Sequence, residues 1–98
     1  MASLCLMLIT HIALGQNNLQ FKILDKETNE PMVGATAYVS ATSGAIANAD
    51  GLATLNDLPN GEISIRFSFV GYKTKNQVFS LPLAQAQPVI ILMEEDHE

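Results

Sequence analysis

Residues 33–72 most constrain the fold, because short alternating stretches are separated there by glycine-containing turns at regular intervals. An Asp-Gly pair at 50–51 and an Asn-Gly pair at 60–61 indicate turns, since Gly accepts a positive φ and Asp or Asn tolerates one. Strands of this length with such turns between them are typical of a small β-sandwich. The segment therefore predicts an all-β chain.

The clearest alternation lies in residues 62–70. One face of the predicted strand carries four large apolar side chains, namely Ile63, Ile65, Phe67 and Phe69. The other face is polar and includes Arg66. Burial of each large apolar side chain contributes about 1.5–3 kcal/mol, so this segment is predicted to be the central core strand.

Further strands are predicted on both sides of this segment, at residues 19–24, 35–40, 42–48, 52–55, 76–81 and 89–93. The strand at 35–40 carries small inward residues, which would let two sheets approach closely. Residues 89–93 form an unbroken apolar run, from which we expect that strand to be covered on both faces. About seven short strands favour an Ig-like or transthyretin-like sandwich.

Residues 1–15 differ from the rest and are interpreted as a signal peptide. Residues 4–9 are an apolar run, and Ala13 and Gly15 place small residues at the −3 and −1 positions of a cleavage before Gln16. The apolar stretch is shorter than the roughly 20 residues that span a bilayer. No Lys or Arg precedes Lys22, so we expect the true start to lie upstream. A buried N-terminal strand is the alternative.

The remaining chain divides into a domain at residues 16–94 and an acidic tail or the start of a linker at 95–98. Cys5 stands at the beginning of the apolar run and follows Leu4, so lipidation is not expected. If the signal peptide is removed, the mature chain has no cysteine and forms no disulfide.

Charge and length limit the partners. A chain of 98 residues forms one small domain, and ten acidic against five basic residues give a net charge of −5. Nucleic acid and anionic lipid are therefore poor partners.

The residue types needed for catalysis are scarce. After the expected cleavage the remaining histidine is His97, which lies in the acidic tail. Single carboxylates are assigned to turns, namely Asp25, Glu27, Glu30, Asp50, Asp57 and Glu62. A calcium site is the alternative for them, although a D-x-D-x-D-G spacing is missing. Tyr38 and Tyr72 could stack on a sugar, but a core or corner role is preferred. We predict a non-catalytic chain with no cofactor, no metal and no catalytic residue.

The sequences of three segments resemble those of one protein family. Residues 34–39 read GATAYV, residues 58–61 read LPNG, and residues 63–72 read ISIRFSFVGY, as in the carboxypeptidase-regulatory-like domain. The resemblance covers about 75 residues, nearly everything after the first few. It implies a β-sandwich without an active site of its own.

The order of segments along the chain is similar to that in one group of proteins that contain this domain. A signal peptide, a sandwich and an acidic stretch at 94–98 resemble the N-terminal extension of TonB-dependent outer-membrane receptors, including those similar to SusC. The resemblance implies an exported accessory module on the periplasmic side of the outer membrane. Its partner would be the receptor's own plug and barrel in the same chain, or a periplasmic protein.

Two alternatives stay open. One is a stand-alone secreted sandwich that binds carbohydrate or protein, and the other is the regulatory domain of a metallocarboxypeptidase. The sequence that follows Glu98 in the genome would separate them, since a TonB box and barrel strands would select the receptor.

Overall fold

The computed structural model describes residues 17–40 and 43–97, and it confirms the all-β class and the seven strands. The strands are β1 (Asn17–Asp25), β2 (Thr36–Ser40), β3 (Ser43–Ile46), β4 (Leu52–Leu58), β5 (Gly61–Ser68), β6 (Lys75–Leu81) and β7 (Val89–Met93). The predicted signal peptide at 1–15 lies outside the described residues. No helix long and apolar enough to cross a membrane occurs in the described part of the chain.

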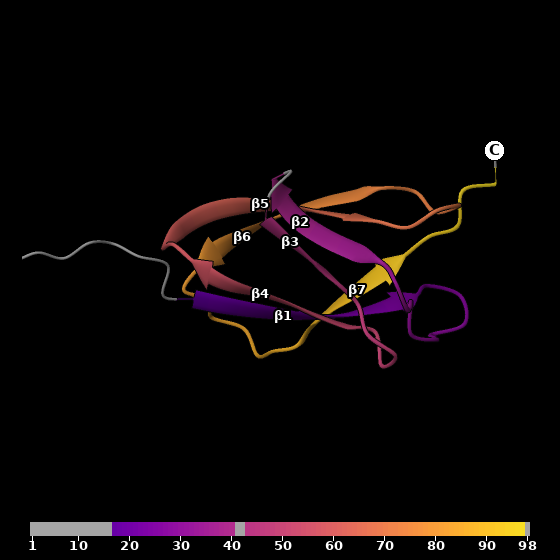
Figure 1. Cartoon of the computed structure of the whole chain (residues 1–98), viewed down its shortest axis with the longest axis horizontal. Helices are drawn as coiled ribbons and strands as arrows, with labels where there is room; N and C mark the ends of the chain where they lie inside the picture. The colour runs from indigo at the N-terminus through magenta and orange to yellow at the C-terminus, as the bar shows by residue number, and fades with distance from the viewer. Residues whose placement is uncertain (1–16, 41–42, 98) are drawn as a thin grey trace, which may run out of the picture.

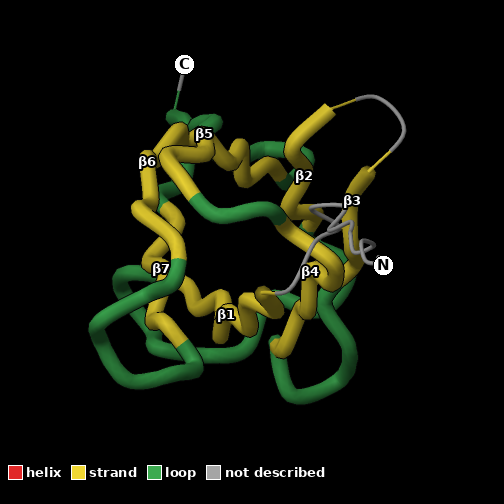
Figure 2. The backbone as a smooth tube through the Cα atoms, turned by 90° about the vertical axis from the view of Figure 1, so that its left-hand side faces the viewer, coloured by secondary structure: helices red, strands yellow, loops and turns green. Residues whose placement is uncertain are grey.

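The strands form two sheets that face one another (Figure 1). One sheet has the order β4-β1-β7 and the other has the order β3-β2-β5-β6. Figure 2 shows the sandwich end-on, with β6 and β7 together on one side and β3 and β4 on the other. All neighbouring strands are antiparallel except β1 and β7, which are parallel. The predicted sandwich is therefore confirmed.

The core fills the space between the sheets. Its largest fully buried side chains are Phe21, Phe67, Leu19, Ile23, Ile65, Ile91 and Met93. The rings of Phe21 and Phe67 meet edge to face with centroids 4.9 Å apart, and Phe79 lies 5.4 Å from Phe21. Edge-to-face pairs add about 0.5–1.5 kcal/mol beyond the apolar area that they bury. These three rings join β1 of one sheet to β5 and β6 of the other.

The small residues and the central turn behave as the sequence predicts. Ala35 and Ala37 are fully buried, so the second strand brings little bulk to the interior. Gly51 has φ +80°, and a Cβ built there would lie 2.7 Å from the carbonyl oxygen of Ile23. That oxygen belongs to backbone and cannot move aside cheaply, so only glycine fits this turn.

The prediction that residues 89–93 are covered on both faces is wrong. Val89, Ile91 and Met93 are buried, but Ile90 is 52% exposed and Leu92 is 38% exposed. The physical reason is the position of β7, which ends the three-stranded sheet in a two-layer sandwich. Only one face of such a strand meets the opposite sheet, and no third layer covers the other face within the described residues.

Asp57, a carboxylate predicted in a turn, lies inside a strand instead. It is in β4, which extends past residue 55 to Leu58, whereas Glu62 lies in β5, where the alternation of residues 62–70 also places it. Asp57 has φ +59° where the register between β1 and β4 shifts, and its N–H bonds to the side-chain oxygen of Asn18 at 3.2 Å. This irregularity is a β-bulge, and the tolerance of Asp for positive φ explains its place there.

Candidate binding surfaces

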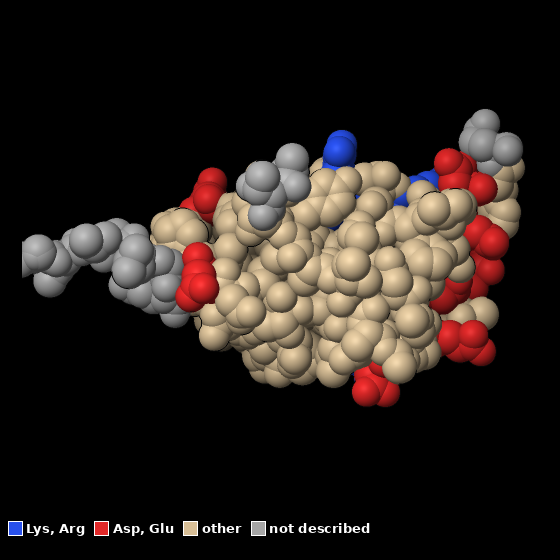
Figure 3. Space-filling model, viewed as in Figure 1, with Lys and Arg blue, Asp and Glu red and all other residues tan. Residues whose placement is uncertain are grey.

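The carboxylates singled out in the sequence do not form a metal centre. No group of three or more His, Cys, Asp or Glu side chains is placed to hold a metal ion in residues 17–40 and 43–97. The structure brings Asp25, Glu27 and Glu30 to one rim with Glu95, around a hollow of about 450 Å³. Figure 3 shows acidic groups gathered at the end of the molecule where the C-terminus lies.

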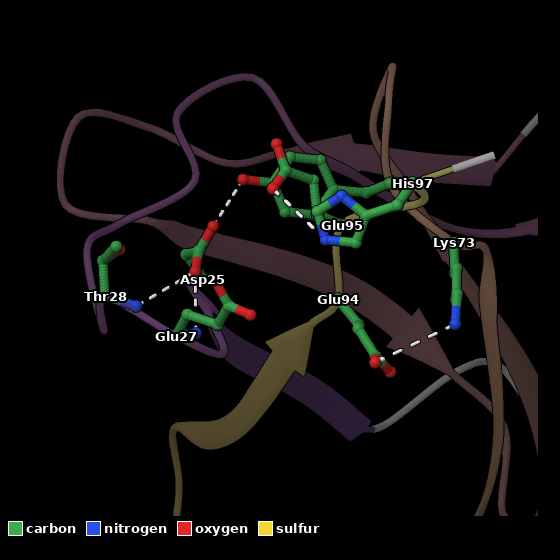
Figure 4. A network of polar contacts seen from close by, with 8 residues as sticks. Asp25, Glu27, Thr28, Lys73, Glu94, Glu95 and His97 are labelled. Atoms are coloured by element: carbon green, nitrogen blue, oxygen red, sulfur yellow. Dashed lines mark hydrogen bonds and ion pairs between the residues drawn. The ribbon is translucent and has the colours of Figure 1, made fainter.

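Asp25 is the best-connected residue at this rim. Its Oδ1 accepts the backbone N–H groups of Glu27 at 2.8 Å and Thr28 at 3.0 Å, which closes the turn after β1 (Figure 4). Its Oδ2 accepts a hydrogen bond from the hydroxyl of Tyr72. A carboxylate that accepts local backbone N–H groups is typical of an Asx turn, so the prediction of turn chemistry is confirmed for Asp25.

The contact between Asp25 and Tyr72 shifts the pKa of both groups. The hydrogen bond from Tyr72, followed by those from the backbone of Thr28 and Glu27, lowers the pKa of Asp25 below its ordinary value. The same bond, with desolvation and the negative charge of Asp25, raises the pKa of Tyr72 to about 12. The Tyr72 ring also packs edge to face on Phe69 at 5.6 Å. Tyr72 therefore has the corner role that the sequence favours.

Tyr38 lies in a different setting, on the outer face of the four-stranded sheet. It is half-buried and stands in a cross-strand row, between Gly44 of β3 and Arg66 of β5, which in turn pairs with Asn76 of β6. A Cβ at residue 44 would lie 2.7 Å from the Cβ of Tyr38, so glycine leaves one side of the tyrosine open. Hollows of about 430 and 440 Å³ flank the ring.

A third surface lies beside the outer edge of β7. A hollow of about 350 Å³ is lined by Lys26, Lys73, Thr74, Lys75, Leu92 and Glu94. Lys75 donates from Nζ to the carbonyl oxygen of Leu92 at 3.3 Å. Glu94 lies 3.8 Å from the Nζ of Lys73 and 4.0 Å from that of Lys26. Figure 4 shows Lys73 beside Glu94, the residue that follows the end of β7.

Sequence reasoning missed this third surface. Its residues come from three separate segments, which lie after β1, around the start of β6 and at the end of β7. The two lysines at 73 and 75 could have indicated this surface, because basic residues are few in this acidic chain and these two lie close together.

Comparison with known protein families gives one result. A model of the CarboxypepD_reg-like domain matches residues 20–98, which include nearly all of both sheets and the segment after β7. A search of curated proteins finds no match.

Proposed function

The chain belongs to the CarboxypepD_reg-like domain family, and on this premise we propose that it is a non-catalytic binding module in the periplasmic N-terminal extension of a TonB-dependent outer-membrane nutrient receptor. The family match over residues 20–98 is the observation that carries the proposal. The family is a regulatory-like β-sandwich domain, and its two-sheet fold is the one described above.

The chemistry of the described residues supports a binding role. The two groups with shifted pKa, Asp25 and Tyr72, bond to one another at a strand corner. Asp25 is held as a carboxylate by three donors, and Tyr72, whose pKa is raised further above its ordinary value of 10.0, is protonated at neutral pH. Such a pair stabilises a turn and does not supply a base poised near neutrality.

The placement of the sandwich between other segments supports the receptor setting. An apolar stretch precedes the domain, and the acidic residues 94–98 follow β7 directly. In Figure 1, β1 begins at one end of the long axis and the segment after β7 leaves at the other. This arrangement lets the chain enter the module at one end and continue into a following domain from the other.

Deletion within the full-length receptor tests the proposal. The gene should continue after residue 98 into a TonB box, a plug and a barrel. Removing residues 19–93 from that protein should leave ligand binding by the purified receptor intact and reduce uptake by cells. Loss of ligand binding by a folded deletion variant, or unchanged uptake, would contradict an accessory role.

The export step has its own test. Mass spectrometry of the protein recovered from the outer membrane or periplasm should give an N-terminus at or near Gln16. Recovery of an intact Met1 from that compartment would show that residues 1–15 are retained.

The row that contains Tyr38 favours a second candidate, a secreted sandwich that binds carbohydrate. An aromatic ring with an open side, next to Arg66 and Asn76, offers a stacking surface together with hydrogen-bond donors. Titration of the labelled chain with maltohexaose should then shift the amide signals of β2 and β5, and Tyr38→Ala should abolish the shifts. Thr54→Ala, on the other sheet, is the control. Unshifted spectra at millimolar sugar would remove this candidate.

A further inference from the structure

The outer edge of β7 has backbone groups available for another strand. In the parallel pair of β1 and β7, Asp25 is opposite Met93, and the N–H of Lys26 bonds to the carbonyl oxygen of Met93 at 2.9 Å. Alternate residues of a strand direct their backbone groups to opposite sides, so those of Ile90 and Leu92 point away from β1. The bond from Lys75 Nζ to the Leu92 carbonyl lies on that side.

This edge differs from that on the other side of the same sheet. The three-stranded sheet ends in β4 and β7, and β4 packs beside β3 of the opposite sheet. Beyond β7, the bond from the N–H of Lys73 to the oxygen of Glu94 joins the two sheets. Residues 89–92 lie before this closure, and no strand of the described residues pairs with β7 on this side, where the Leu92 carbonyl accepts the bond from Lys75. An unpaired row of N–H and C=O groups is a template for an added strand.

The side chains next to the edge are apolar and basic. Ile90 and Leu92 face outward on β7, at 52% and 38% exposure. Three of the five Lys and Arg residues of the chain line the hollow beside Leu92. The carboxylate that lines the hollow, Glu94, lies within 4.0 Å of both Lys73 and Lys26, so three lysines and one carboxylate give the lining a net charge of +2. This local charge is opposite in sign to the net charge of −5.

We propose that the free edge of β7 binds an extended acidic peptide, which adds a strand to the three-stranded sheet. The backbone of the peptide pairs with Ile90 and Leu92, and a carboxylate enters the hollow between Lys73 and Lys75. An apolar side chain two residues away from that carboxylate lies beside Ile90, because side chains on one face of a strand recur at every second residue. The proposal rests on the binding role proposed above and names its partner class.

A second copy of this chain fits the edge less well. Pairing of two β7 strands around a two-fold axis would be antiparallel, with residue 91 opposite its equivalent. Glu94 would then lie opposite residue 88 of the other copy, away from the lysines that follow residue 72. The acidic residues after β7 would gain no positive partner in that arrangement.

Peptide binding to the full exported chain tests the proposal. The probe is a fluorescent hexapeptide of alternating Glu and Val, and the comparison probe alternates Lys and Val. Fluorescence anisotropy should show saturable binding of the acidic probe that weakens with added salt, and little binding of the basic probe. Amide signals of residues 89–93 should shift, whereas those of β3 should not.

Charge reversal with a matched control tests the role of the lysines. Lys75→Glu should weaken binding of the acidic probe about tenfold, because a carboxylate then meets a like charge. Arg66→Glu changes the net charge by the same amount on the outer face of β5, away from the hollow that Lys75 lines, and should alter the affinity less than about twofold. Equal losses of affinity in the two variants would mean that only the overall charge of the chain matters, and this would overturn the site.

Ile90→Pro tests the backbone pairing. It removes an N–H that points away from β1, so the bonds between β1 and β7 are retained and binding of the probe should be lost. If this variant does not fold, the Lys75→Glu comparison still decides the outcome. Probe binding that persists in folded Ile90→Pro, or peptide-free dimerisation through β7 in sedimentation, would overturn the proposal. The two proposals can fail separately. If this chain binds the acidic probe but cells with the deletion variant of the receptor take up ligand normally, the peptide site is kept and the receptor role is rejected.

Discussion

Strands β5 and β7 bury their inner faces in the same way but present very different outer faces. β5 places Ile65 and Phe67 in the core and turns Arg66 to solvent. β7 places Val89, Ile91 and Met93 in the core and turns Ile90 and Leu92 outward. β5 lies between two neighbours in its sheet, whereas β7 has one.

The difference teaches that the outer face of a strand carries information that the core face does not. Polar outward residues on an interior strand are the usual arrangement of a sandwich in water. Apolar outward residues on an edge strand expose a surface that tends to associate, and proteins commonly protect such edges with charge. Here Lys75 donates to the Leu92 carbonyl on the edge of β7, and Lys26 and Lys73 line the hollow beside it.

Truncation of the β5 core should have the largest effect. Phe67→Ala should lower the free energy of unfolding by about 3–5 kcal/mol, because Phe67 is fully buried against Phe21. Arg66→Ala, on the exposed face of the same strand, should change it by less than about 0.5 kcal/mol. Urea denaturation measures both. Similar losses in the two variants would mean that the register of β5 is wrong.

A matched pair of substitutions on β7, one on each face, should differ less in its cost to the free energy of unfolding. Ile91→Ala should cost about 2–4 kcal/mol, since Ile91 is fully buried. Ile90→Ala should cost less than about 1 kcal/mol, because half of that side chain is already in water. Thermal unfolding checks the contrast, and equal costs would show that the outer face of β7 is covered after all.

Removal of the Tyr72 hydroxyl should have the smallest effect and depend on pH. The raised pKa of Tyr72 means that its contribution is present below its ordinary value of 10.0 and is lost as the pH rises towards about 12. The lowered pKa of Asp25 means that its contribution is present above 3.8 and is lost as the pH falls through the lowered value. Tyr72→Phe should flatten the loss at high pH. The measurement is the free energy of unfolding of both proteins from pH 9 to 12. The same pH dependence in wild type and variant would contradict the contact.

Alternation and turn chemistry were sufficient to predict most of the fold. The inward side chains of 62–70 and the turn at Gly51 follow from local rules about period and positive φ. The environment of residues 89–93 did not follow, because an unbroken apolar run is compatible both with two covered faces and with an edge whose outer face is exposed. Which one occurs depends on sheet order, and sheet order is a property of the whole chain.

The candidate surfaces were harder to predict than the strands. Tyr72 was assigned to a corner correctly, but its bond to Asp25 joins residues that lie far apart in the chain. The hollow beside Leu92 draws on three segments that only tertiary structure brings together. Sequence patterns describe how one strand meets the core and say little about which residues of different strands become neighbours.

The parallel pairing of β1 with β7 also sets an order of events during folding. Phe21 is opposite Val89, so the first strand of the domain finds one of its two neighbours only when the last strand is available. The pair of β5 and β6 is local and can form early, whereas the sheet built on β1 has to wait. The pairing of β1 with β7 therefore cannot form until the last strand is available, and a chain that ends before β7 leaves β1 with an unpaired edge.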